Sequence, residues 1–268
     1  MEPINDADVT ASSTAALHLP RILCLHGGGT NARIFATQCR SLVQLLKAEF
    51  RLVFAEAAFP SQAGPDVTVV YGDWKPFKRW MRWLPHHPAV GHDEAVGALD
   101  DSLREALRKD DLRGATGECV ALLGFSQGAK MVASLLYRQQ LRDEAGLLPP
   151  GTLRFRFGVI MAGSAPLVAL DPSLCPRPGL PDASDISELK PCEPRVYVLR
   201  LPTIHVHGTL DPGLARHRRL VEEFCDPKTS AVVEWEGEHR LPLKQTDVAP
   251  IIGHIRRLAR ETGVYDDV

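Results

Sequence analysis

The sequence lacks the features that would place it in a membrane or on nucleic acid. No apolar run approaches the roughly 20 residues that a helix needs to span a bilayer. Lysine and arginine (31) do not outnumber aspartate and glutamate (33), which leaves a net charge of −2. No basic face is implied, so nucleic acid is not an expected partner. The composition therefore favours an ordinary globular protein.

The two ends of the chain carry no targeting signal. The first 20 residues are polar and lack the cationic and apolar regions of a secretory signal, and we expect a flexible leader to about Pro20. The final residues, Val-Tyr-Asp-Asp-Val, match no prenylation, retention or peroxisomal signal. We therefore expect a cytoplasmic protein.

Cysteine is present but forms no recognisable framework. None of the six cysteines pairs as C-x-x-C or clusters with histidines at a zinc-like spacing. Cys24 and Cys119 lie in apolar runs that are typical of buried thiols. We expect free cysteines, no metal and no cofactor.

Short apolar runs alternate with helical patterns from residue 21 onward. The predicted strands cover 21–25, 51–55, 119–123, 157–161, 203–207 and 231–235. The predicted helices cover 34–50, 92–109, 127–140, 215–224 and 250–261. This alternation predicts an α/β fold with a mostly parallel sheet covered by helices on both faces. Without a break in composition, residues 21–268 are expected to form one domain.

Two segments interrupt the alternation. Residues 59–90 hold three of the four tryptophans within ten residues, and residues 166–202 hold eight of the 21 prolines. Long excursions of this kind in an α/β domain are usually functional loops. We expect the second one to form a lid or a rim.

The stretch Gly124-Phe-Ser-Gln-Gly128 matches the short pattern G-x-S-x-G. The apolar strand 119–123 precedes it and the helix 127–140 follows at once. A nucleophile elbow needs this context, because the strand delivers the serine to the sheet edge and the helix N-terminus faces the reaction centre. Ser126 is therefore predicted to be a nucleophile.

A serine nucleophile needs a base that an acid orients, and in this kind of sheet the order along the chain is Ser, acid, His. Asp211 follows the strand 203–207 in a loop, where it reads equally as a turn residue before Pro212. Asp226 and Asp247 are the other candidates, and neither follows a strong strand. We favour Asp211 as the acid.

His239 lies 28 residues after Asp211, in the loop after the strand 231–235. The remaining candidates are His205, His207, His217 and His254. The first two precede the aspartate and alternate along a strand, so we expect packed residues. The last two fall in predicted helices, and we expect surface groups. His239 is the predicted base.

An oxyanion hole needs two N–H donors set at the position of the developing charge. Gln127, directly after the serine, is expected to supply one, and Gly28 in the loop His26-Gly-Gly-Gly-Thr-Asn is expected to supply the other. This loop lacks the ending of a P-loop and does not fit G-x-G-x-x-G. His26 reads either as a brace for the loop or as a simple strand-end residue.

Four stretches carry a resemblance to a known family. They are LCLHGGGTN near the start, FAEAAFPSQAGP at 54–65, LLGFSQGAKMVASLL at 122–136, and HVHGTLDP at 205–212 with His239. From about Arg21 to Leu258 the chain resembles the family serine hydrolase group of α/β-hydrolases, and within it the fungal polyketide-releasing thioesterases of the lovastatin type. This chain departs from the family in carrying three glycines after His26.

The resemblance implies transfer of an acyl group to water. The implied substrate is a polyketide or fatty acyl chain held as a thioester on a carrier protein, in secondary-metabolite biosynthesis. Trp74, Phe77 and Trp80 are candidates for a substrate wall. Because Phe77, Trp80, Met81 and Leu84 would share one helical face, a local core is an equal alternative.

Other functions fit the same residues. A carboxylesterase acting on small oxygen esters would use an identical triad, and sequence does not separate it from a thioesterase. A non-catalytic binding protein of the same fold would have no need for Ser126, Asp211 and His239 together. Cyclisation or transesterification would need a pocket that keeps water from the acyl-enzyme, and no residue pattern indicates one.

Overall fold

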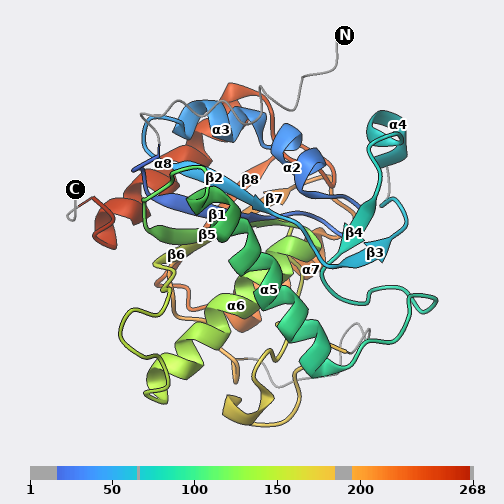
Figure 1. Cartoon of the computed structure of the whole chain (residues 1–268), viewed down its shortest axis with the longest axis vertical. Helices are drawn as coiled ribbons and strands as arrows, with labels where there is room; N and C mark the ends of the chain where they lie inside the picture. The colour runs from blue at the N-terminus through green and yellow to red at the C-terminus, as the bar shows by residue number, and fades with distance from the viewer. Residues whose placement is uncertain (1–16, 65–66, 185–194, 266–268) are drawn as a thin grey trace.

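The centre of the molecule is a sheet of six parallel strands (Figure 1). The computed structural model describes residues 17–64, 67–184 and 195–265, so most of the expected leader lies outside the described residues. In chain order the strands are β1 Arg21–Leu25, β2 Arg51–Ala55, β5 Cys119–Phe125, β6 Phe157–Met161, β7 Thr203–Gly208 and β8 Ser230–Trp235. They lie in the order β2-β1-β5-β6-β7-β8, and every pairing is parallel. The predicted fold class is confirmed.

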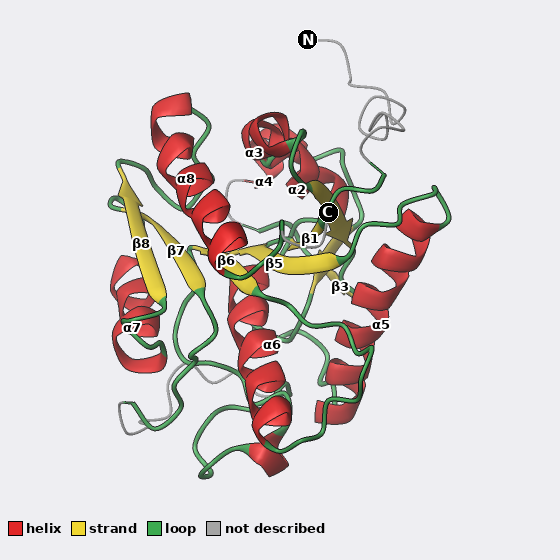
Figure 2. Ribbon diagram, turned by 90° about the vertical axis from the view of Figure 1, so that its left-hand side faces the viewer, coloured by secondary structure: helices red, strands yellow, loops and turns green. Residues whose placement is uncertain are grey.

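Helices cover both faces of this sheet (Figure 2). One face carries α2 Ala32–Gln38, α3 Arg40–Leu46 and α8 Gln245–Glu261, and the other carries α5 His92–Asp111, α6 Gln127–Glu144 and α7 Leu214–Phe224. Successive residues of a strand point to opposite faces, so Ile22 and Cys24 join one core while Leu23 and Leu25 join the other. This double burial explains why the strands read as continuous apolar runs.

Two helices differ most from their predicted bounds. The helix expected over 34–50 is two helices, because Cys39 leaves the helical conformation at φ −80°, ψ 5° between α2 and α3. The last helix begins at Gln245 rather than at Pro250. A proline inside a helix removes one N–H donor, and α8 tolerates this because Ile251, Ile252 and Ile255 bury its apolar face.

The first excursion contains a small antiparallel hairpin. Its strands are β3 Phe59–Ser61 and β4 Phe77–Arg79, with the short helix α4 Val67–Tyr71 between them. The shared helical face expected for Phe77 and its neighbours is wrong, because residues 77–79 are extended and alternate between two sides. Lys78 joins this hairpin to the loop after β1, where Gly29 N–H donates to its carbonyl (2.9 Å) and its own N–H donates to Thr30 O (2.7 Å).

The second excursion is described only in part. Its described residues include a 3-10 turn at Pro172–Leu174, and residues 185–194 lie outside the described part, so the expected lid stays a prediction. Five cysteines in the described ranges are free thiols, and Cys192 lies outside them. No helix among the described residues has the length and apolar character to cross a membrane.

Candidate active site

Ser126 lies at the sharp turn between β5 and α6. Its backbone has φ 52° and ψ −116°, a left-handed conformation that costs a non-glycine residue free energy and is typical of functional turns. Its N–H donates to Met161 O at 2.9 Å. Behind it, a Cβ atom on Gly128 would lie 2.1 Å from Leu25 O. The second glycine of the motif is therefore required for α6 to leave directly against β1.

The structure brings Ser126, His239 and Asp211 together in one chain of hydrogen bonds. His239 Nε2 lies 2.9 Å from Ser126 Oγ, and His239 Nδ1 lies 2.7 Å from Asp211 Oδ2. A carboxylate accepts at Nδ1, so the proton sits there and Nε2 is free to accept from the serine hydroxyl. The Asp211 side chain is 2% exposed and that of His239 is 40% exposed, so the base faces outward and the acid is shielded.

Two loops from neighbouring strands hold the acid and the base. A Cβ atom on Gly208, at the end of β7, would lie 2.3 Å from Gly237 O, so the loop after β8 packs directly on the end of β7. Thr209 N–H donates to Trp235 O (2.9 Å) and Leu210 N–H donates to Gly237 O (3.0 Å). Backbone bonds therefore fix the separation between Asp211 and His239.

Asp211 is also fixed by its own loop. Its Oδ1 accepts the Gly213 N–H at 2.7 Å, which leaves Oδ2 for His239. The other aspartates have different partners. Asp226 accepts the N–H of Lys228 (2.9 Å), and Asp247 lies in the first turn of α8.

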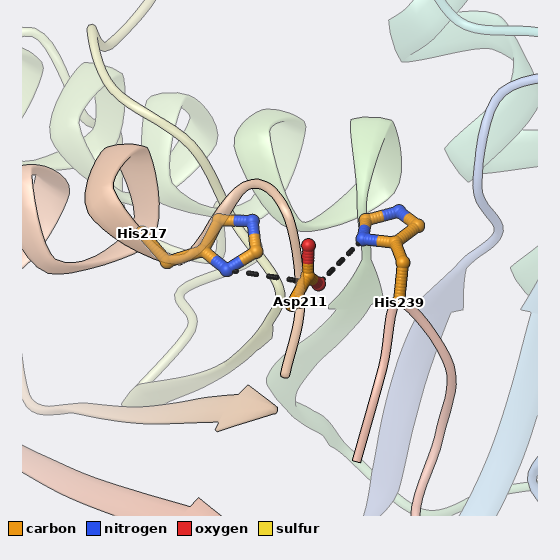
Figure 3. Close-up of side chains that lie close together, drawn as sticks. All are labelled: Asp211, His217 and His239. Carbon is orange, nitrogen blue, oxygen red and sulfur yellow. Dashed lines mark hydrogen bonds and ion pairs between the residues drawn. The ribbon is translucent and has the colours of Figure 1, made fainter. Parts of the chain in front are cut away.

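His217 is the residue that the sequence analysis misplaced. We expected a surface group, but it is 2% exposed on the inner face of α7. Its Nδ1 lies 3.9 Å from Asp211 Oδ2, on the side away from His239 (Figure 3). Burial lowers the pKa of His217 to about 4, so this ring is neutral near pH 7. Its spacing to Leu220 and Phe224, three and seven residues, was the available signal of an inward position.

Three buried imidazoles line up behind the acid. Ring centroids are 6.2 Å apart for His205–His207, 5.8 Å for His207–His217 and 6.1 Å for His217–His239. His205 and His207 are packed residues of β7, as expected. Burial lowers the pKa of His205 to about 3 and that of His207 to about 4. Asp211 therefore has the neutral His217 ring on this side, and His239 is the imidazole within hydrogen-bond distance.

The two expected oxyanion donors lie in the glycine loop and at the serine turn, which are in contact. Within the described ranges, the backbone N–H groups of Gly28 and Gln127 donate to no protein atom. A Cβ atom on Gly28 would lie 3.3 Å from Gln127 Oε1, and one on Gly27 would lie 3.5 Å from Ser126 Cβ. The glycine loop therefore lies against the serine turn, with its N–H groups available to an incoming oxygen.

His26 braces the glycine loop. It is fully buried, its Nε2 lies 3.2 Å from both Ala57 N and Glu56 Oε1, and its Nδ1 lies 2.8 Å from Gly27 O. Thr30 Oγ1 donates to the same carbonyl (2.7 Å). The sequence allowed two roles for His26, support of the glycine loop or a simple strand-end position, and these contacts favour support of the loop.

The three residues expected in a substrate wall lie in different surroundings. Trp80 packs on the His26 ring and donates from Nε1 to His26 O at 2.7 Å. Phe77 packs in a small cluster with Ile34 and Val67. Trp74 lies under the guanidinium of Arg33 and against Tyr71. Their contact with an acyl chain stays a prediction.

Gln127 joins the excursion to the serine turn. Trp80 N–H donates to its side-chain Oε1 (2.8 Å), and its Nε2 donates to Met81 O (3.0 Å). Its backbone N–H donates to no atom of the described residues. Sequence reasoning assigned only the backbone role, because a contact 46 residues away leaves no local pattern.

Asp211, His217 and His239 together offer three metal-ligand atoms within 4.8 Å of one another. Bonds of about 2.0 Å to a tetrahedral zinc ion would put two ligand atoms roughly 3.3 Å apart. The 2.7 Å between His239 and Asp211 is instead a hydrogen-bond distance. The described geometry therefore fits proton transfer from Ser126 to His239.

Comparison with known proteins agrees with this geometry. A family model described as "Serine hydrolase (FSH1)" matches residues 15–251. The chain is 56% identical over 256 residues to esterase claE of Penicillium crustosum, covering 94% of this chain and 97% of that one. It is 55% identical over 247 residues to esterase citA of Monascus ruber, covering 92% and 95%.

Among solved structures, the acyl-protein thioesterase 2 of Zea mays superposes with a TM-score of 0.50 at 14% identity, covering 90% of this chain and 94% of that one. This likeness shows the α/β-hydrolase fold alone. The sequence matches go further, because they span nearly the whole chain and the residues that form the hydrogen-bonded site. The chain belongs to the FSH1 family of serine hydrolases.

Proposed function

We propose that this serine hydrolase cleaves acyl thioesters and releases a polyketide or fatty acyl chain from a carrier protein in cytoplasmic secondary metabolism. The observation that carries the proposal is the hydrogen-bonded line Ser126–His239–Asp211 opposite two unpartnered backbone N–H groups. This arrangement attacks an ester-type carbonyl and stabilises the oxyanion. The resemblance to polyketide-releasing thioesterases supports the choice of a carrier-bound thioester.

The proposed mechanism assigns one role to each residue. His239 Nε2 takes the proton of Ser126 as its oxygen attacks the acyl carbonyl, and Asp211 holds the imidazole and stabilises its charged form. The N–H groups of Gly28 and Gln127 hold the oxyanion. The thiol leaves with a proton from His239, and water then attacks the acyl-enzyme by the same route.

The test compares one medium-chain acyl group presented as a thioester and as an oxygen ester. We expect a higher kcat/KM for the thioester, and we expect Ser126→Ala to lower kcat by on the order of 10⁶ for both. The variant should melt as the parent does. A Ser126→Ala protein that kept most of its rate would overturn the nucleophile assignment.

A carboxylesterase acting on small oxygen esters is the second candidate. The observation that favours it is the name esterase carried by relatives at 55–56% identity. Both activities use the same triad and differ in the leaving group. A clear preference for the oxygen ester in the same comparison would select this function and leave the triad assignment standing.

A further inference from the structure

The stretch between Asp73 and Asp93, at the end of the excursion beside the serine turn, has charge of one sign. Residues 74–92 contain two lysines, two arginines and three histidines, and no aspartate or glutamate. In a chain with a net charge of −2, this is a local excess of positive charge. The segment is also held at the site, because Lys78, Trp80 and Met81 bond to the glycine loop or to Gln127. The charge therefore lies next to the proposed oxyanion hole.

Arg79 is buried without a counterion. The residue is 1% exposed, its Nε donates to Pro60 O (3.1 Å), and its guanidinium lies 5.1 Å from the centre of the Phe59 ring. Its Nη1 has no partner, and no carboxylate of the described residues pairs with it. Burying a charge without a counterion is costly. The Pro60 carbonyl and the Phe59 ring satisfy only part of the hydrogen-bonding capacity and charge of this guanidinium.

Three further nitrogens near Arg79 are buried and unpartnered. They belong to Arg82 (Nε), Trp83 (Nε1) and His87 (Nε2). Arg82 Nε and Trp83 Nε1 are donors, and the backbone N–H of Trp83, whose nitrogen lies 3.5 Å from His87 Nδ1, favours the proton of the His87 ring on Nε2. The pKa of His87 is lowered by burial and by the charges of Arg79, His86 and Arg82. These nitrogens have no acceptor of their own among the described residues, although Arg82 Nη2 donates to Pro85 O (2.6 Å).

This cluster reaches the reaction centre through Trp83. A Cβ atom on Gly28 would lie 3.4 Å from Trp83 Nε1, and Gly28 is one of the two proposed oxyanion donors. Arg82 and Trp83 are half-buried, so each keeps part of its side chain exposed to solvent, unlike Arg79. A substrate bound at Ser126 would therefore pass beside these donors.

We propose that Arg79, Arg82, Trp83 and His87 form a subsite that binds an anionic oxygen group of the substrate, a phosphate or a carboxylate. Such a group supplies the acceptor and the negative charge that the cluster lacks, and hydrogen bonds from charged donors are the strong ones. The inference rests on the proposed function, because the anion belongs either to the acyl chain or to the phosphopantetheine arm that carries it.

The test uses matched thioesters that differ by one charge. Octanoyl-pantetheine is compared with octanoyl-phosphopantetheine, which adds the phosphate of the arm, and with a pantetheine thioester of octanedioic acid, which adds a carboxylate to the chain. We expect wild-type kcat/KM to be at least about tenfold higher for one charged substrate than for the neutral one. The substrate that gains identifies the source of the anion.

Variants then assign the preference to the cluster. Arg82→Gln should abolish the advantage of the charged substrate and leave the neutral one within about twofold. Arg79→Gln should do the same, with thermal melting as a check, since its burial makes misfolding a risk. Lys78→Gln is the matched control, because it removes the same charge from the opposite side of β4. It should leave the preference intact.

Two outcomes would overturn the subsite. One is equal wild-type kcat/KM for neutral and charged substrates, and the other is an Arg82→Gln loss that is the same for all of them. The three substrates are also made as oxygen esters, so that failure of the subsite can be distinguished from failure of the proposed function. If only the oxygen esters react, the thioesterase proposal fails while the charge comparison still tests the subsite.

Discussion

At the scale of single residues, the site depends on which ring nitrogen of His239 carries the proton. Asp211 accepts at His239 Nδ1, and this fixes Nε2 as the atom that faces Ser126. This assignment follows from one hydrogen bond to the far nitrogen of the ring. Removing the carboxylate charge should therefore matter more than removing its volume.

We predict that Asp211→Asn lowers kcat by about 10⁴ while the fold is kept, because an amide donor at Nδ1 favours the wrong tautomer of His239. Hydrolysis of an activated ester, with a thermal melt, measures both effects. Asp226→Asn is the control, since it is the same change at the next aspartate along the chain, away from His239. If Asp226→Asn lost as much activity as Asp211→Asn, the acid would be misassigned.

At the scale of elements, the nucleophile turn depends on close contact between β1 and α6. Gly128 lies where a Cβ atom would be 2.1 Å from Leu25 O and 2.6 Å from His26 O. Both obstacles are backbone atoms of a central strand and the loop that follows it, so neither moves cheaply. A side chain here would separate the serine turn from the loop that carries Gly28.

We predict that Gly128→Ala lowers the free energy of unfolding by more than about 2 kcal/mol and lowers kcat, because the helix must shift away from β1. Gly97→Ala is the matched control. Gly97 lies inside α5 with nothing within 4 Å of a new Cβ, so this change should stabilise the protein by up to about 1 kcal/mol. Urea unfolding measures both, and equal effects would contradict the close contact.

The sequence was sufficient to predict features that depend on local residue patterns. Apolar runs predicted all six strands of the sheet to within two residues. The three site residues were predicted from the chain order Ser, Asp, His and from the place of each residue after a strand. The features that the sequence did not predict depend on contacts between distant parts of the chain. The break at Cys39 and the hairpin of β3 and β4 depend on packing against other parts of the chain. The inward position of His217 did have a local signal, its spacing to Leu220 and Phe224 on α7, and the prediction of a surface group overlooked it.

At the scale of the whole molecule, three buried neutral histidines link stability to pH. His205, His207 and His217 have pKa values of about 3, 4 and 4 in the folded protein, chiefly because of burial. The ordinary value in an unfolded chain is about 6.5. Between these values the unfolded chain binds more protons than the folded one. Their contribution is constant above about pH 6.5 and falls as the pH drops toward 4.

We predict that the free energy of unfolding decreases between pH 7 and pH 5, by up to about 1.4 kcal/mol per pH unit for each histidine. His207→Leu should remove the contribution of one histidine to this pH dependence. It should change the free energy of unfolding little at pH 7, because both nitrogens of His207 lack partners. Urea titrations at the two pH values measure the slopes. Identical slopes for parent and variant would contradict this account.

The side chain of Gln127 holds the neighbouring segment, whereas its backbone N–H belongs to the serine turn. Its amide clamps Trp80 and Met81, while its N–H belongs to the turn and is present whatever side chain the position carries. An engineer could therefore exchange the amide for an aliphatic group and loosen the neighbouring segment without deleting the proposed oxyanion donor. Substrate range and chemical rate would then be adjustable separately at one codon.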